Sequence, residues 1–169
     1  MERPVLVRRG ELADLPALTA IYNHYVENSV FTFDLAPFSV EARRQWFDQF
    51  SGAGPHQLFV ALRDGDLAGY ACSTRFRPKP AYDRSVEASV YIAPEAHGHG
   101  LGSRLYETLF DALRHAPVHR VYAGIALPND ASRAVHIKFG FQPRYVLSEV
   151  GWKFDRYVDV EWFEKKMDG

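Results

Sequence analysis

The sequence predicts an α/β fold, in the wider α+β sense, with a mixed central β-sheet of about seven strands and about four flanking helices. Apolar stripes at helical spacing alternate with short β-rich runs along the chain. An Asp64-Gly65 pair between two such runs is a strong hairpin signal. The elements follow the order strand–helix–helix, then a β-meander, then two βα units, and this order indicates a mixed sheet.

The first third of the chain contains one predicted strand, residues 5–9, and two predicted helices. Asp14 is a plausible N-cap for the first helix, and Pro16 lies in its first turn. Its apolar stripe consists of Leu15, Leu18, Ile21, Tyr22, Tyr25 and Val26. The second helix is shorter. It begins near Ser39, and its buried side carries Trp46, Phe47 and Phe50.

Strands and helices alternate in the rest of the chain. Three strands are predicted over residues 58–62, 67–74 and 85–92. A long helix over residues 100–115 follows, and one face of it carries Leu101, Leu105, Leu109, Ala112 and Leu113. A strand at 121–127 leads to a helix at 131–139, which Gly140 ends. Strands at 144–150 and 157–163 complete the order.

Length and composition limit the class of protein. The 169 residues predict one domain, residues 1–169, and a composition that is 47% hydrophobic is typical of globular proteins. The formal net charge of −1 favours neither nucleic acid nor an acidic membrane as a partner. Cys72 is the only cysteine, which excludes an internal disulfide and a thiolate zinc cluster. No secretory signal or membrane-length apolar run is present, so we expect a cytoplasmic protein.

The segment His97-Gly98-His99-Gly100-Leu101-Gly102-Ser103 carries the clearest functional signal. It joins the 85–92 strand to the long helix. Glycines let the backbone approach an anion closely, and the first free N–H groups of a helix point toward it. The segment therefore predicts a phosphorylated ligand. A tight strand-to-helix connection is the alternative.

Two common phosphate-binding motifs do not fit this segment. A P-loop needs a lysine after its last glycine, and none follows Gly102. The dinucleotide fingerprint Gly-x-Gly-x-x-Gly lacks its third glycine here, and no acidic residue follows at the required distance of about 20 residues. The phosphorylated ligand must therefore belong to another class.

The segment resembles the Gln/Arg-x-x-Gly-x-Gly/Ala pyrophosphate loop of the GCN5-related N-acetyltransferases (GNAT). It occurs here as His97-x-x-Gly100-x-Gly102, with His97 where Gln or Arg is usual. In that family the loop holds the pyrophosphate of acetyl-coenzyme A (acetyl-CoA). A second block, residues 127–143, resembles the family's Asn-x-x-Ala-x-x-Leu-Tyr-x-x-x-Gly-Phe segment. Its matching residues are Asn129, Ser132, Val135, Gly140 and Phe141, and His136 replaces the usual tyrosine.

The chain most resembles the branch of phosphinothricin and methionine sulfoximine N-acetyltransferases, from about residue 5 to residue 162. The similar segments are residues 23–26, 81–82, 86–92, 100–102, 127–130 and 151–154. The resemblance implies the GNAT fold, acetyl-CoA as co-substrate without a metal, and a small-molecule amine as acceptor. It also implies a homodimer, with neither nucleic acid nor membrane as a partner.

Glu87 is the candidate general base. Acetyl transfer needs one because an ammonium group has no lone pair with which to attack. On the 85–92 strand, Glu87, Ser89 and Tyr91 share one face. A carboxylate there is costly unless it is paired or faces a cavity. A structural ion pair with Arg75 or Arg77 is the alternative, but the match to the branch favours catalysis, either directly or through a water molecule.

His136 is the candidate proton donor to the departing thiolate, because imidazole titrates near neutrality. Histidine is usual at this position in the branch. The alternative is a helix histidine that bonds to the coenzyme or to the backbone without transferring a proton.

The resemblance implies that three segments bind the coenzyme. Backbone groups of Val90, Tyr91 and Ile92 would bind the pantetheine arm, where the family's fourth and fifth strands splay apart. Asn129 would contact the arm from the other side, with Ser132 nearby, although Asn129 also suits a turn or an N-cap. The phosphate loop would contribute Gly98, His99, Gly100, Leu101, Gly102 and Ser103.

Five residues are candidates for the acceptor pocket. Phe33, Arg75, Arg77 and Tyr82 lie on segments that line this pocket in the branch, and Lys153 would close it, with a neighbouring subunit as one possible source. Arginine suits a substrate carboxylate. Arg77 matches a basic position of the branch and Arg75 does not, and a solvated edge-strand charge is the alternative for both. His97 and His99 have no third ligand near them, so no metal is expected.

The sequence therefore predicts an N-acetyltransferase that acts on the primary amine of a small amino-acid analogue, such as phosphinothricin or methionine sulfoximine. Another acceptor is the first alternative: an amino acid, a protein N-terminus, or a polyamine, which the nearby arginines disfavour. A non-catalytic acyl-CoA-binding module is the second. Such a module would keep the glycine loop but would need neither Glu87 nor His136.

Overall fold

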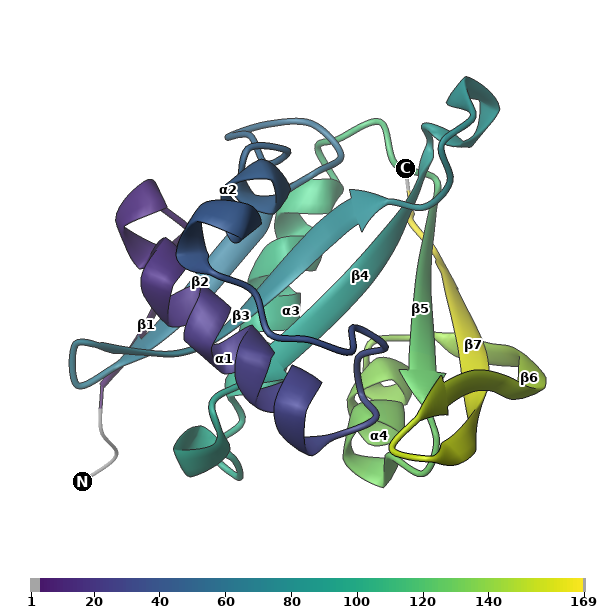
Figure 1. The fold of residues 1–169 in the computed structure, drawn as a ribbon. Helices are drawn as coiled ribbons and strands as arrows, with labels where there is room; N and C mark the ends of the chain where they lie inside the picture. The colour runs from purple at the N-terminus through teal and green to yellow at the C-terminus, as the bar shows by residue number, and fades with distance from the viewer. Residues whose placement is uncertain (1–3, 169) are drawn as a thin grey trace.

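Seven strands of the described part of the chain form one sheet in the order β1-β2-β3-β4-β5-β7-β6 (Figure 1). The computed structural model describes residues 4–168. The strands are β1 (Val5–Arg9), β2 (Leu58–Arg63), β3 (Asp66–Arg75), β4 (Ser85–Ile92), β5 (Arg120–Ala126), β6 (Gln142–Lys153) and β7 (Arg156–Lys166). Strands β4 and β5 are parallel, and the other neighbouring pairs are antiparallel. The predicted mixed sheet of seven strands is confirmed.

Helices cover both faces of this sheet. They are α1 (Leu15–Asn28), α2 (Val40–Phe47), α3 (Leu101–Leu113) and α4 (Asp130–Lys138), with 3-10 turns at Leu12–Asp14, Pro80–Tyr82 and Pro94–Ala96. Helices α1 and α2 lie on one face and α3 on the other (Figure 1). Tyr106 of α3 contacts His136 of α4, so α4 belongs to the α3 side. None of the helices between residues 4 and 168 is long and apolar enough to cross a membrane.

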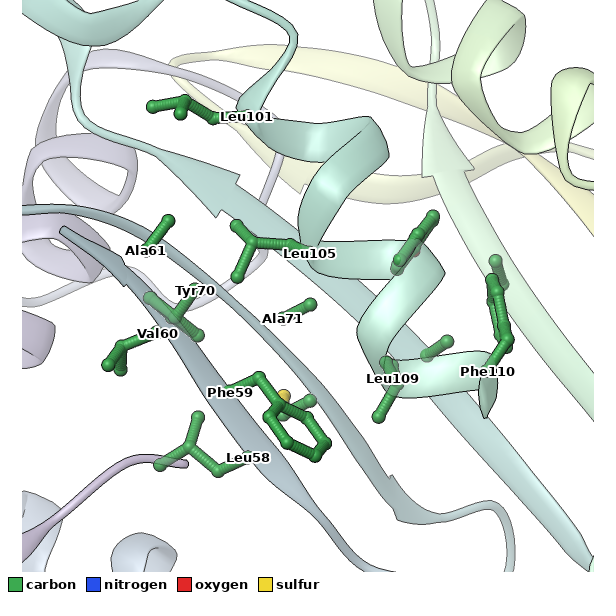
Figure 2. Packing of buried hydrophobic residues seen from close by; sticks show 14 of the residues in the cluster. Leu58, Phe59, Val60, Ala61, Tyr70, Ala71, Leu101, Leu105, Leu109 and Phe110 are labelled. Atoms are coloured by element: carbon green, nitrogen blue, oxygen red, sulfur yellow. The ribbon is translucent and has the colours of Figure 1, made fainter. Parts of the chain in front are cut away.

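The main core cluster includes residues on both faces of the central strands, and Figure 2 shows its packing beside α3. Leu105 and Leu109 of α3 have no solvent exposure, and they lie over β2 and β3 near Ala61 and Ala71. Small alanine side chains let the helix approach the sheet closely, and each buried leucine contributes about 2 kcal/mol of hydrophobic stabilisation. Alternation along β3 places the next residue, Cys72, on the opposite side of the sheet, where it is buried.

The predicted hairpin turn and the predicted start of the second helix near Ser39 are confirmed. Asp64 and Gly65 join β2 to β3, and both have positive φ (57° and 92°), as a two-residue hairpin turn requires. The side chain of Ser39 caps α2 by accepting a hydrogen bond from the amide of Ala42 at 3.1 Å. Both segments therefore form the turn and the cap that their residue types favour.

The cap predicted for α1 is different. Asp14 precedes the helix, but its side chain makes no cap hydrogen bond with α1. Its carboxylate accepts two hydrogen bonds from Arg8, at 2.7 and 2.9 Å, and one from the amide of Glu11 at 2.8 Å. The carboxylate pairs with a charged residue on β1 and does not cap α1, so Asp14 links the first strand to the start of the helix.

The last two strands are longer than predicted. Both extend beyond the predicted ranges 144–150 and 157–163, whereas α2 ends before Phe50. Strand β7 pairs with β5 on one side and with β6 on the other. Pairing with neighbouring strands therefore keeps polar residues in the sheet at positions where no apolar pattern predicts a strand.

Candidate active site

Strands β4 and β5 separate after a short parallel ladder (Figure 1). Only residues 85–87 of β4 pair with residues 120–122 of β5 in the described part of the chain. Beyond them lies a cavity of about 320 Å³, which we call the glycine-loop cavity. Its walls include residues 88–92, 96–103 and 123–126, the side chains of Tyr25, Phe31 and Asn129, and the first two turns of α4.

The glycine loop shapes one end of this cavity. Gly98 and Gly100 have positive φ (78° and 68°), and Gly100 is the N-cap of α3. A Cβ atom at either glycine would meet nothing within 4 Å, so the loop borders open space. The first amides of a helix have no partner within it. This end of the cavity therefore offers N–H donors and the positive end of the α3 dipole to an anion.

The histidines of the loop bond to the protein itself. The Nε2 atom of His97 lies 2.9 Å from the hydroxyl of Tyr25 and 3.1 Å from the carbonyl oxygen of Ile92. The Nδ1 atom of His99 lies 3.3 Å from the carbonyl oxygen of Ala96. His97 thus connects the loop to β4 and α1, which is a positioning role. No group of three histidine, cysteine or acidic side chains among residues 4–168 is arranged to hold a metal.

A second cavity, of about 700 Å³, lies on the α1 and α2 side of the sheet. We call it the α2 cavity. The two cavities share the wall residues Phe31, Ser89, Tyr91, Gly124 and Ala126. The second half of β4 therefore borders both spaces, and molecules bound in the two cavities would meet at the gap between β4 and β5.

Glu87 lines the α2 cavity. It lies opposite Thr74 of β3 and Tyr122 of β5 in the sheet. Burial raises the pKa of its carboxyl group above the ordinary value, and the positive charge of Arg77 partly opposes that rise. The described residues include no ion pair with either Arg75 or Arg77 for this carboxylate. A half-buried, partly desolvated carboxylate at a cavity wall has the environment of a general base.

His136 lines the glycine-loop cavity, but both of its ring nitrogens are engaged. Its Nδ1 atom lies 2.7 Å from the carbonyl oxygen of Ser132, which can only accept, so Nδ1 carries the proton. The Nε2 atom then accepts from the hydroxyl of Tyr106 at 2.8 Å. Burial lowers the pKa of the imidazole. His136 is therefore a neutral, fixed ring in this arrangement.

The remaining predicted coenzyme residues gather around the glycine-loop cavity. All of them line it: Val90, Tyr91, Ile92, Gly98, His99, Gly100, Leu101, Gly102, Ser103, Asn129 and Ser132. Asn129 also caps α4, since its Oδ1 atom accepts from the amide of Ser132 at 3.1 Å. The capping role that its residue type suggested is present together with its place on the cavity wall.

The predicted acceptor residues are less concentrated. Phe33 lines the α2 cavity, whereas Lys153, Arg75, Arg77 and Tyr82 are absent from both walls. The buried Lys153 donates to the carbonyl oxygen of Thr32 at 2.8 Å, which fixes the 29–38 loop against β6. Arg75 forms an exposed ion pair with Asp83 at 3.2 Å.

Arg77 and Tyr82 both contact Phe76. The Arg77 guanidinium lies 4.7 Å from the centroid of the Phe76 ring, and the Tyr82 ring lies 6.1 Å from it. The charge of Arg77 also acts on Glu87. The charge of Arg77 therefore affects a carboxylate on the wall of the α2 cavity, although Arg77 itself does not line that cavity.

Sequence reasoning missed Arg43, a buried cation on the wall of the α2 cavity. It lies on α2, three residues before Trp46, and so shares the buried side of that helix. A charged residue on an otherwise apolar helix stripe was the available signal. Tyr22 and Asp34, joined by a short hydrogen bond, line the same cavity and were also missed as site residues.

A sequence model of the Acetyltransferase (GNAT) family matches residues 18–141, well over half of the chain. The chain belongs to the GNAT family. The predicted family and enzyme class are therefore confirmed, and the seven-stranded sheet with its splayed β4 and β5 is the GNAT fold of this chain.

Three similar proteins place this GNAT enzyme more narrowly. It is 49% identical over 165 residues to a phosphinothricin N-acetyltransferase of Streptomyces coelicolor, across 96% of both chains. It is 32% identical to an L-methionine sulfoximine/L-methionine sulfone acetyltransferase of Pseudomonas aeruginosa, across 96% of this chain and 94% of that one. A phosphinothricin acetyltransferase from Sinorhizobium meliloti, solved in complex with acetyl-CoA, has a TM-score of 0.91 and 30% identity, covering 96% and 88% of the two chains. These similarities support acetyl transfer to an amine.

Proposed function

We propose that this GNAT enzyme acetylates the primary amine of a small amino-acid analogue, of the phosphinothricin or methionine sulfoximine/sulfone type. Acetyl-CoA is the acetyl donor and Glu87 the general base. The observation that carries the proposal is the meeting of two cavities at one gap between strands. One cavity ends at a helix N-terminus lined with glycines, and the other has a half-buried carboxylate on its wall.

The glycine-loop cavity fits the coenzyme. Gly98 and Gly100 leave open space where side chains would block a pyrophosphate, and the first amides of α3 face that space as donors. The edge of β4 that faces β5 is unpaired beyond residue 87 within the described chain, and it supplies backbone groups for the amides of the pantetheine arm. When bound, the coenzyme supplies a thioester whose carbonyl carbon accepts the amine.

Glu87 removes a proton from the incoming ammonium group in this proposal. Its raised pKa brings the carboxylate closer to the pH at which a base both stays ionised and accepts a proton readily. The carboxylate and its cavity lie on the same face of β4 as Ser89 and Tyr91, which border both cavities. Proton removal by direct contact and through one water molecule both fit this placement.

His136 has a positioning role at the glycine-loop cavity in this proposal, because it bonds to Ser132 and to Tyr106. Its donor hydrogen is committed to Ser132 and its acceptor nitrogen to Tyr106. That geometry supports the alternative of a fixed histidine over a proton donor to the thiolate.

The similar proteins support the choice of acceptor, since two of them are named for phosphinothricin and one for methionine sulfoximine and sulfone. An assay of thiol release from acetyl-CoA tests the proposal, with phosphinothricin, methionine sulfoximine, methionine sulfone, free amino acids, an N-terminal peptide and a polyamine as acceptors. The amino-acid analogues should have the highest kcat/KM. A higher kcat/KM for the peptide or the polyamine would mean that the acceptor belongs to that class and not to the amino-acid analogues. Coenzyme binding without turnover of any amine would favour a non-catalytic module.

We also propose that the enzyme is a homodimer. The β6–β7 hairpin exposes an apolar surface made of Tyr145, Val146, Leu147, Val150, Trp152, Phe154 and Tyr157, each at least 40% exposed. Exposed large apolar side chains gathered on one hairpin are typical of an interface. Leu147 and Val150 also line the α2 cavity, so a second copy on the hairpin would lie beside that cavity.

A further inference from the structure

The α2 cavity contains a cation that the proposed chemistry leaves unused. Arg43 of α2 is 5% exposed and lines the wall together with Tyr22 and Trp46. It is the single lysine or arginine on this wall within the described residues, and the acidic side chains there are Asp34 and Glu87. Arg75 and Arg77, the arginines expected to meet the substrate, lie outside the wall.

Aromatic rings hold the guanidinium of Arg43. Its Cζ atom lies 3.8 Å from the ring centroid of Trp46, 4.2 Å from that of Tyr22 and 5.7 Å from that of Phe38. Aromatic faces attract a cation. The N–H donors of a guanidinium lie in its own plane, however, so stacking against its faces leaves those donors without acceptors.

Two of these donors have no hydrogen-bond partner. The Nε and Nη2 atoms of Arg43 are buried and unbonded within the described structure. They form one edge of the planar fork, the edge that can bind both oxygens of a carboxylate. Buried donors in native proteins are almost always paired, and a buried charge without a partner is strongly unfavourable.

The acidic residues of the cavity do not satisfy Arg43. Asp34 accepts a short hydrogen bond from the hydroxyl of Tyr22. No ion pair joins Arg43 to Asp34 or Glu87 in the part of the chain that the structure describes. Arg43 and Glu87 also act with opposite signs on the buried thiol of Cys72, whose pKa burial raises to about 12. Arg43 and Glu87 line the same cavity, so the positive and negative groups face one shared space.

We propose that Arg43 binds the oxyanion of the acceptor, a carboxylate or a phosphinate, through its guanidinium group. The inference rests on the proposed function, because it uses the same cavity. Arg43 and Glu87 attract opposite charges, so together they orient a zwitterionic amino acid with its ammonium group toward Glu87. The same cation disfavours a polyamine, which brings no anion to pair with it.

Kinetics with paired acceptors tests this assignment. Methionine sulfone and its carboxamide differ in one anionic group, and Arg43→Met removes the cation while keeping an apolar stem. We expect kcat/KM for methionine sulfone to fall about 10- to 100-fold, with little change for the carboxamide and none in the KM for acetyl-CoA. The phosphinothricin carboxamide keeps its phosphinate, so a loss confined to it and to phosphinothricin would assign Arg43 to the phosphinate. Equal losses for every acid and amide, or no loss, would overturn the proposal.

Arg44→Met is the matched control. Arg44 is the next residue of α2, but its side chain is half exposed and forms an ion pair with Asp48 at 2.7 Å. This variant should keep the preference for the acid over the amide. Arg43→Lys keeps the charge without the fork and should lose part of that preference. If Arg43→Met does not fold, Arg43→Lys provides the test. The same ratio of kcat/KM for the acid to kcat/KM for the amide in Arg43→Lys as in the wild type would then overturn the assignment.

Equilibrium binding separates this inference from the proposed function. Calorimetric titration of phosphinothricin or methionine sulfone into the wild-type enzyme holding free CoA, which has no acetyl group, measures binding without chemistry. Weaker binding to Arg43→Met than to the wild type supports the anion site even where no amine is turned over, an outcome that would end the proposed function alone. Equal affinity for the two proteins, or no affinity of the wild type for either acid, would overturn the inference.

Discussion

Glu87 of β4 and Tyr122 of β5 form the last residue pair at which these two parallel strands remain in register. One step further along β4 the strands separate and the glycine-loop cavity begins. Glu87 itself faces the α2 cavity on the other side of the strand. The end of the ladder therefore places a carboxylate beside the gap at which the two cavities meet.

Glu87→Gln is expected to lower activity and raise stability at neutral pH. Loss of a general base costs about 10²- to 10⁴-fold in rate. Burial raises the pKa of Glu87, so the folded protein at neutral pH carries a desolvated carboxylate that an amide avoids. Turnover assays and urea unfolding of the two proteins at pH 7.5 would measure both effects.

The stability gain of Glu87→Gln should depend on pH with a definite sign. Below the ordinary value of 4.5 the carboxyl group is protonated whether the chain is folded or unfolded, so the gain should be smallest there. It should grow as pH rises from that value through the raised pKa of the folded state, because the unfolded chain ionises first. A gain that stays constant from pH 4 to pH 8 would contradict burial as its cause.

Arg77→Gln should shift the acid limb of the pH–rate profile to higher pH. The positive charge of Arg77 lowers the pKa of Glu87, so its removal lets burial raise that pKa further. The base then needs a higher pH to ionise. Arg75→Gln is the control, because Arg75 pairs with Asp83 and should leave the limb in place. An equal shift in both variants would indicate a general surface-charge effect.

Tyr157→Glu should dissociate the proposed homodimer. Tyr157 is 63% exposed on the β6–β7 hairpin and packs edge-on against Trp152, with 4.7 Å between ring centroids. A carboxylate buried at an apolar interface would be unpaired and costly. Leu35→Glu is the control, since Leu35 is 73% exposed outside the hairpin. Sedimentation velocity of the three proteins measures the outcome, and a monomeric wild type would reject the dimer.

The fold and the glycine-loop cavity could be predicted from the sequence more completely than the α2 cavity. A phosphate-binding turn is a local feature: Gly98, Gly100 and the first turn of α3 are adjacent in the chain, so spacing alone indicates them. The α2 cavity instead brings together α2, β4 and the 29–38 loop. The position of Arg43 on the apolar stripe of α2 was its only signal in the sequence, and that signal is weak because a helix arginine is usually solvated.

Charges near a site were the hardest to place from sequence. Arg75 and Arg77 lie on or just after β3, next to the strand that carries Glu87, and the resemblance to the branch suggested that they contact the substrate. Alternation along the strand does not reveal which partner a long side chain finds. Arg75 pairs with Asp83, eight residues further along the chain, and the guanidinium of Arg77 stacks against the ring of Phe76. Long flexible cations are thus less predictable than backbone turns.

His136 should titrate below its ordinary value of 6.5 and remain a neutral ring at pH 7. Burial disfavours the charged form, and the Tyr106 hydroxyl stabilises the unprotonated Nε2. Nitrogen NMR of the imidazole would identify the protonated Nδ1 form directly. Titration at or above pH 7 would restore the role of proton donor to the thiolate.

Gly100→Ala should weaken acetyl-CoA binding and also destabilise the protein, and Gly65→Ala separates the two effects. Both glycines have positive φ (68° and 92°), where an alanine costs about 1–2 kcal/mol, and a Cβ at either would meet no atom within 4 Å. The loss of unfolding free energy should therefore be similar. Gly65 lies in the β2–β3 turn, away from the cavity walls, so only Gly100→Ala should raise the KM for acetyl-CoA, by roughly 3- to 10-fold for one disturbed amide contact. Equal KM values in the two variants would mean that strain alone acts and that the loop amides do not hold the coenzyme.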